Sequence, residues 1–133
     1  MLYIQLEKED QDLKTKLQQQ SGKPFPEEEI MKILRDVSLA LHDLHSCNIA
    51  HLDIKPANII LGKEGNYLLA DFGHSVVMSG GSKMVAHEGD TNYFAPEFLN
   101  FLPIDLRKAD VYSLGMTILE LVLKELPISI DDM

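Results

Sequence analysis

Residues 51–73 of the chain read HLDIKPANIILGKEGNYLLADFG, and this stretch decides the fold. Pro56 lacks a backbone donor and restricts the residue before it, so the first eight residues predict an irregular loop. The apolar runs NIIL and YLLA predict two short strands, and the five residues between them, two of which are glycines, predict a hairpin connection. Such a hairpin places Asn58, at the start of one strand, beside Asp71, which follows the other.

Length, composition and charge limit the classes of protein that this chain can represent. Its 133 residues, 45% hydrophobic and 25% charged, fit one ordinary globular domain. A formal net charge of −9 argues against binding to nucleic acid, which is itself negatively charged. The sequence also contains no basic cluster that would bind an anionic membrane surface. The single cysteine, Cys47, excludes an internal disulfide and fits a reducing compartment. We therefore expect an intracellular protein of the nucleus or cytoplasm, with no nucleic-acid partner.

Hydrophobic spacing outside the hairpin predicts helices and leaves one segment without regular structure. Residues 2–6 favour a short strand, and residues 9–20 favour a polar surface helix. The strongest helix is predicted over residues 27–47, where apolar residues recur every three or four positions behind an acidic first turn. Residues 74–94 carry no clean periodicity. Residues 107–123 predict a last helix that is apolar on nearly every face and is therefore expected to be buried on every side. Its most apolar stretch, residues 111–123, is interrupted by polar residues and is too short to span a bilayer.

Three motifs in order resemble those of eukaryotic protein kinases. The loop has the pattern H-x-D-x-x-x-x-N, DFG follows it, and residues 95–97 supply A-P-E. The resemblance implies an α+β fold, the mainly helical C-lobe of a kinase with a small β-hairpin carrying the catalytic and magnesium-binding loops. It makes residues 1–133 a partial protein kinase domain with these parts: hinge strand 1–7, two helices 8–47, catalytic loop, hairpin and DFG 48–73, activation segment 74–97, and central helix 107–123.

Phosphoryl transfer requires positioning and charge compensation more than covalent chemistry. By resemblance, Asp53 accepts the proton of the attacking hydroxyl, and Lys55 neutralises charge on the transferring phosphoryl group. Asn58 and Asp71 match the residues that hold magnesium, so the implied cofactors are ATP and Mg²⁺. Taken alone, each of these side chains would be an ordinary solvated loop residue; their shared spacing favours the kinase interpretation.

The resemblance gives other motif residues structural roles. His51 and Phe72 match stacked members of the internal hydrophobic spine of kinases. Glu97 and Asp110 match scaffold residues, and Asp110 is expected to bind the backbone of the catalytic loop. The remaining histidines are scattered, with no Cys or His cluster to suggest a metal site, so they are predicted to be surface or satisfied core residues: His42, His45, His74 and His87.

Two departures from the common kinase pattern narrow the family. Leu52 stands where most kinases have an arginine, which normally pairs with a phosphate on the activation segment. Residues 88–97, EGDTNYFAPE, resemble the Wee/Myt kinases, which inhibit cyclin-dependent kinases. The dipeptide Gly73-His74 and the lack of a membrane segment in this chain favour the Wee branch over the membrane-associated Myt branch.

This narrower resemblance also assigns residues to the nucleotide. Residues 4–7, IQLE, resemble the hinge strand of that family. The match places Glu7, Lys8 and Glu9 beside the adenine, and Ile60 is assigned to the same site. These four residues join Asn58 and Asp71 as the expected ATP-binding set.

Two hypotheses of function result. The first is a Wee-like protein kinase that transfers the terminal phosphoryl group of ATP to a tyrosine or threonine hydroxyl of a protein, expected to be a cyclin-dependent kinase. The alternative is a truncated, inactive kinase-like chain that binds a protein partner through the helix at 107–123. The sequence contains no glycine-rich phosphate loop and no ATP-anchoring lysine of the V-A-x-K type, so the isolated 133 residues are expected to be inactive.

Overall fold

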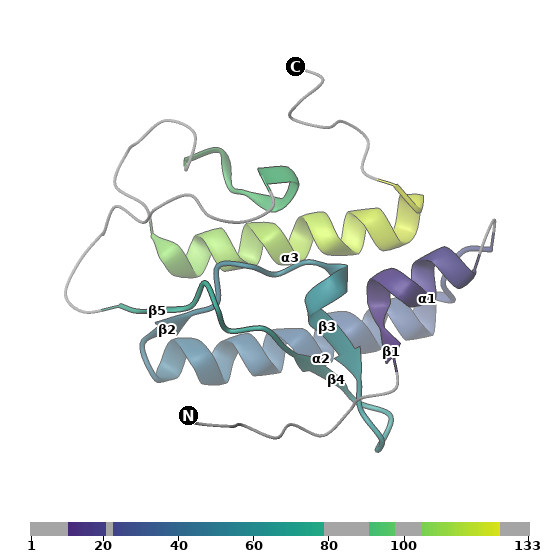
Figure 1. The fold of residues 1–133 in the computed structure, drawn as a ribbon, viewed down its shortest axis with the longest axis horizontal. Helices are drawn as coiled ribbons and strands as arrows, with labels where there is room; N and C mark the ends of the chain where they lie inside the picture. The colour runs from purple at the N-terminus through teal and green to yellow at the C-terminus, as the bar shows by residue number, and fades with distance from the viewer. Residues whose placement is uncertain (1–10, 21–22, 79–90, 98–104, 126–133) are drawn as a thin grey trace, which may run out of the picture.

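Two long helices and a small antiparallel sheet form the centre of the molecule. Helices α2 (Glu27–Ser46) and α3 (Leu106–Leu123) run side by side in opposite directions, and β4 (Tyr67–Leu69) packs on α2 (Figure 1). This arrangement confirms the predicted α+β, mainly helical fold. The structure is a computed structural model that describes residues 11–20, 23–78, 91–97 and 105–125. The predicted hinge strand at 1–7 lies outside these residues.

The first helix begins later than its spacing predicts. Helix α1 spans Leu13–Gln19, and the side chain of Asp12 accepts a hydrogen bond from Thr15 N at 2.8 Å. An aspartate at this position satisfies an otherwise unpaired N–H of the first turn, so the helix starts after it. The two residues before the helix, Gln11–Asp12, instead form the short strand β1, which pairs with β3.

The hairpin forms where the sequence predicts it. Strand β3 (Ile59–Leu61) pairs antiparallel with β4, and β1 lies on the other edge of β3. Gly65 in the connection has φ +84°, a conformation that glycine adopts without steric cost. Ala70 N donates to Asn58 O at 2.9 Å, which extends the pairing one step beyond β3 toward both motifs.

A second sheet was not expected from the sequence. Strand β2 (Ile49–Ala50) pairs antiparallel with β5 (Val76–Val77), in segments that predicted only a loop and an aperiodic stretch. Strands of two residues show no alternation that periodicity can detect, and their pairing joins distant parts of the chain. The consequence is that the segment after DFG is tied to the start of the catalytic loop.

One apolar core lies between α1, α2, α3 and the hairpin. A buried Leu, Ile or Val side chain contributes about 1.5–3 kcal/mol relative to an exposed one, so this cluster supplies much of the driving force for folding. The buried members come from these elements and from the segments that precede α2 and the hairpin: Leu13, Phe25, Ile33, Val37, Leu41, Ile54, Ile59, Tyr67, Leu114 and Leu121.

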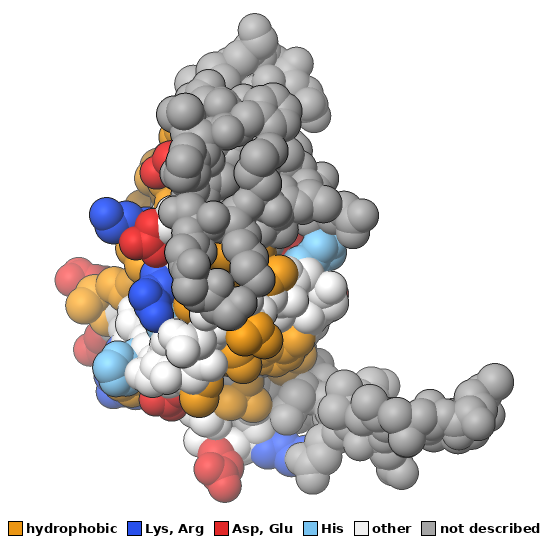
Figure 2. Space-filling model, turned by 90° about the vertical axis from the view of Figure 1, so that its left-hand side faces the viewer, with side chains coloured by type: hydrophobic (Ala, Val, Ile, Leu, Met, Phe, Trp, Pro, Cys, Tyr) orange, Lys and Arg blue, Asp and Glu red, His pale blue; other side chains and the backbone are white. Residues whose placement is uncertain are grey.

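Helix α3 is buried on one side, not on every side as predicted. Val111 is 60% exposed and Val122 is 49% exposed, whereas Leu114 and Leu121 face the core. A single helix presents only part of its circumference to the layer formed by α2 and the catalytic loop, which explains the one-sided burial in the described residues. None of the helices among those residues is both long and apolar enough to cross a bilayer. The face shown in Figure 2 mixes hydrophobic, acidic and basic side chains.

A partly buried polar cluster fixes the hairpin to α1 and α2. Glu29 accepts hydrogen bonds from Lys16 and from the Tyr67 hydroxyl, the latter at 2.6 Å. Burial alone would raise the pKa of Glu29, but the bonds from Lys16 and Tyr67 outweigh burial and hold this pKa below its ordinary value. Burial and the neighbouring Glu29 raise the pKa of Tyr67. The cluster therefore favours an ionised Glu29 beside a neutral Tyr67.

This cluster predicts a pH-dependent contribution to stability. Because its folded-state pKa is lowered, ionised Glu29 stabilises the protein fully above about pH 5, and this contribution is lost as the pH falls through the lowered value. Urea unfolding of the wild type and of Glu29→Gln should therefore give a difference in unfolding free energy at pH 7 that shrinks toward pH 3. The exposed neighbour serves as control, since Glu28→Gln should show no such trend. A difference for Glu29→Gln that does not vary with pH would contradict the assignment.

Candidate active site

The loop that carries Asp53 begins where β2 ends and reaches the hairpin through one tight turn. Residues 51–55 have no regular structure, and Pro56 opens the 3-10 turn η1 (Pro56–Asn58). Proline suits this first position because its fixed φ matches the turn and no N–H is required there. Strand β3 follows directly, so the loop is anchored at both ends by paired strands.

Asp110 of α3 binds the backbone at the start of this loop. Its side chain is fully buried and accepts hydrogen bonds from His51 N and Leu52 N, each at 2.9 Å. Its Oδ2 also lies 2.8 Å from Nε2 of His45, near the end of α2. A carboxylate without solvent needs such donors, and bonds of this kind are stronger than neutral ones. The predicted contact of Asp110 with the catalytic-loop backbone is confirmed.

The backbone is strained on both sides of the candidate site. Leu52 has φ +63° and Asp71 has φ +56°, values that side-chain-bearing residues rarely adopt. Each such residue costs on the order of 1–3 kcal/mol and persists only where its surroundings enforce it. For Leu52 the surroundings are the hydrogen bond to Asp110 and a small apolar cluster that includes Ala50 and Ala95. The strain lies immediately before Asp53.

The carboxylate of Asp53 is surrounded by predicted site residues. Asp53 is 8% exposed, and Nδ2 of Asn58 donates to its backbone oxygen at 2.7 Å and to its Oδ2 at 2.9 Å. Nζ of Lys55 lies 3.8 Å from Oδ1 of Asp53. The loop thus brings together the expected proton acceptor, the expected cation and one expected magnesium ligand.

His51 supports this arrangement through its ring. Its Nε2 lies 2.9 Å from Ala70 O, and its Nδ1 accepts a hydrogen bond from Asp53 N at 3.1 Å. The two contacts together require the hydrogen on Nε2, which fixes the tautomer. Phe72 meets the His51 ring edge to face at a centroid distance of 5.1 Å. Phe72 is 48% exposed, however, so the expected internal position of this side chain is not seen in the structure.

The hairpin brings the two expected magnesium ligands to neighbouring positions. Asn58 O accepts from Ala70 N, the residue before Asp71, and the Asp71 side chain is exposed, with Oδ1 accepting from Gly73 N at 3.2 Å. Both amide hydrogens of Asn58 are used by Asp53, which leaves its amide oxygen for a cation. An amide oxygen and a carboxylate are hard ligands that fit Mg²⁺. Ile60 lies half-buried in β3 on the same hairpin.

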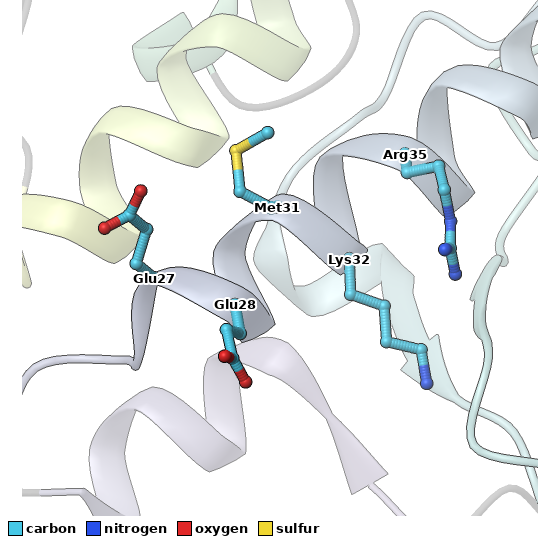
Figure 3. Close-up of a pocket in the computed structure, with 5 residues that line it drawn as sticks. All are labelled: Glu27, Glu28, Met31, Lys32 and Arg35. Atoms are coloured by element: carbon cyan, nitrogen blue, oxygen red, sulfur yellow. The ribbon is translucent and has the colours of Figure 1, made fainter.

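Other predicted residues lie apart from this cluster or outside the described chain. Glu7, Lys8 and Glu9 fall outside the described residues, and Glu97 is exposed. A surface pocket of about 800 Å³ lies along the first turns of α2, its described lining does not include Asp53, and Figure 3 shows five of the side chains around it. Among the described residues, those that line it come from that one helix, and they are Glu27, Glu28, Met31, Lys32 and Arg35. We assign no role in the site to this pocket.

Two histidines for which the sequence predicted no special role contact the candidate site. His45 joins Asp110, as described above, and Nδ1 of His74 lies 3.3 Å from Oδ2 of Asp53. The sequence carried one usable signal for His74, its position directly after DFG. For His45 no local signal existed, because its partner lies 65 positions away.

Comparison with known proteins agrees with this geometry. The family model described as "Protein kinase domain" matches residues 1–133, the whole of the given sequence. The chain belongs to the protein kinase family. Its motifs, fold and the cluster around Asp53 are therefore those of a family of phosphoryl-transfer enzymes.

Several curated relatives of the chain are Wee-like kinases. The chain is 45% identical over 93 residues to the mitosis inhibitor protein kinase SWE1 of Saccharomyces cerevisiae, covering 69% of this chain and 11% of that protein. It is 43% identical over 120 residues to the membrane-associated tyrosine- and threonine-specific cdc2-inhibitory kinase wee-1.3 of Caenorhabditis elegans, covering 90% and 17%. A Wee1-like protein kinase of Arabidopsis thaliana is 40% identical over 121 residues, covering 91% and 23%.

These matches show that the chain is similar to Wee-like kinases, and they do not assign it to one branch of them. The chain spans between about a tenth and a quarter of the length of these three relatives. A membrane-associated kinase and a Wee1-like kinase match at nearly equal identity, so the preference for the Wee branch stays a prediction.

The contacts of Asp110 predict that replacing its carboxylate by an amide lowers the free energy of unfolding. In Asp110→Asn, one oxygen becomes an NH₂ group that faces another donor, so unfolding should require about 1.5–3 kcal/mol less free energy. Asp105, on the same chain segment, caps α3 by accepting from Arg107 N, and asparagine caps helices as well as aspartate does. Asp105→Asn should therefore change stability by less than about 0.5 kcal/mol. Equal effects of the two substitutions in denaturant unfolding would refute the role given to Asp110.

Proposed function

We propose that the protein transfers the terminal phosphoryl group of ATP to a tyrosine or threonine hydroxyl of another protein, and that this substrate is a cyclin-dependent kinase. The observation that carries the proposal is the cluster of Asp53, Lys55 and Asn58, set beside Asp71 by the hairpin. The printed names of the relatives, a mitosis inhibitor kinase and a cdc2-inhibitory kinase, support the choice of substrate. We place its action inside the cell, in the nucleus or cytoplasm.

In this proposal Asp53 is the group that receives the substrate's proton. Its carboxylate orients the acceptor hydroxyl and takes up the proton as the hydroxyl oxygen forms its bond to the terminal phosphorus. The bond between that phosphorus and the bridging oxygen breaks, and ADP leaves. The hydrogen bond from Asn58 fixes the carboxylate, so that little reorganisation is needed during the step.

Charge compensation is assigned to Lys55 and to the hairpin residues. The ammonium group of Lys55, 3.8 Å from Oδ1 of Asp53, is placed beside the reacting hydroxyl, where the transferring phosphoryl oxygens carry negative charge. Asn58 and Asp71 would hold Mg²⁺, which when bound neutralises charge on the phosphates. We further propose that the 133 residues alone are inactive, because they contain no glycine-rich loop to cover those phosphates.

The central test removes the proton acceptor while preserving its shape. In the full-length protein, Asp53→Asn should lower the rate of phosphoryl transfer to a cyclin-dependent kinase by about 10²–10⁴-fold. ATP binding should be largely unchanged, because Asp53 is not assigned to the nucleotide. Transfer can be followed with radiolabelled ATP, and nucleotide affinity by calorimetry.

A matched control uses the same substitution at a distant surface position. Asp43 is exposed on α2, and Asp43→Asn should leave both rate and affinity unchanged. Turnover by Asp53→Asn at the rate of the control would rule out the role proposed for Asp53. If the protein phosphorylates other proteins but not a cyclin-dependent kinase, the proposed substrate is wrong. The proposed reaction, phosphoryl transfer to a protein hydroxyl, is then still supported.

A further inference from the structure

His74 lies against the candidate proton acceptor without a role in the chemistry described so far. Its Nδ1 is 3.3 Å from Oδ2 of Asp53 but is not aligned for a hydrogen bond, and this nitrogen is buried. In the described part of the chain, Nδ1 of His74 has no other hydrogen-bond partner. The rest of the side chain is 32% exposed, so protons from solvent can reach the ring.

The backbone around His74 is fixed to the catalytic loop. Ser75 N donates to Phe72 O at 3.0 Å, and the Ser75 hydroxyl donates to His51 O at 3.3 Å. The next residue, Val76, pairs with Ala50 across β2 and β5. Contacts on the C-terminal side of His74 thus tie the backbone that follows it to the catalytic loop, and the ring lies beside Asp53.

We propose that His74 is a positioning residue that makes phosphoryl transfer sensitive to pH, because its protonated ring pairs with Asp53 and withholds the carboxylate from the substrate hydroxyl. The inference rests on the proposed function and concerns regulation of the same site. A doubly protonated imidazole offers an N–H and a positive charge to Oδ2, which Asn58 already contacts at 2.9 Å. With both a donor and a cation on that oxygen, Asp53 is a weaker acceptor for the substrate's proton.

The charged groups near His74 act in opposite directions on its protonation. The carboxylate of Asp53 faces the ring at 3.3 Å, and a nearby negative charge favours a protonated imidazole. Lys55, which lies 3.8 Å from the other oxygen of Asp53, opposes it. The ring of His51 is buried, and both of its nitrogens are engaged, by Ala70 O and by Asp53 N. Histidine changes charge between about pH 5 and 8, the range in which the effect is expected.

The test compares pH profiles of kcat in the full-length protein. Wild-type kcat should fall about threefold to tenfold between pH 7.5 and 5.5, the range in which imidazole gains its proton. His74→Asn removes the titrating group, so its kcat should change less than about twofold over this range, and it should exceed the wild type at pH 5.5. KM for ATP should be the same in both proteins, since His74 is not assigned to the nucleotide.

Two further variants make the outcome decisive. His42 is exposed on α2, and His42→Asn should keep the wild-type profile. His74→Gln, which retains a longer polar side chain, should behave as His74→Asn does. A wild-type kcat without an acidic fall, or the same fall in His74→Asn as in the wild type, would overturn the inference.

Loss of activity provides a separate outcome. If both His74 variants unfold at the wild-type temperature but are inactive at every pH, the ring is required for turnover and the inhibitory role is wrong. Failure of the proposed function is distinguished by Asp53: if Asp53→Asn retains full turnover, the site assignment itself fails, whatever the profile of His74→Asn.

Discussion

The buried carboxylate of Asp110 is the contact on which the candidate site depends. It joins α3 to two consecutive N–H groups of the catalytic loop and to His45 of α2. Without these bonds nothing polar in the described core would hold Leu52 in its left-handed conformation, which costs on the order of 1–3 kcal/mol. The apolar core supplies the energy that packs the helices together, while this one side chain determines where the loop before Asp53 lies.

The hairpin brings Asp71 next to this fixed loop and so completes the candidate site. Pairing of β3 with β4 extends to Asn58 and Ala70, and it therefore sets Asp71 next to the loop that carries Asp53. Asn58 serves both sides, since its amide donates twice to Asp53 and keeps an oxygen for a cation. In the proposed mechanism, a side chain shared in this way would couple the position of the proton acceptor Asp53 to the position of a bound metal ion.

Much of this could be predicted from the sequence, for reasons that differ between elements. Helix α2 and the hairpin follow from periodicity and turn chemistry, which are local properties. The contact of Asp110 with the loop came from family resemblance, because no local pattern links residues 58 positions apart. The pairing of β2 with β5 and the approach of His74 to Asp53 depend on tertiary structure alone. For that reason the sequence predicted only an ordinary histidine at position 74.

Leu52 is an apolar residue at a position where most kinases have a charged one, and it links the catalytic loop to the segment after DFG by packing. The usual arginine at this position joins the catalytic loop to a phosphate on the activation segment. Here Leu52 packs with Val76, Met78 and Phe94 against a small apolar cluster that includes Ala50 and Leu106. Apolar packing of this kind does not depend on phosphorylation and is not screened by salt. The described parts of the segment after DFG are thus held to the catalytic loop by apolar packing and by the pairing of β2 with β5.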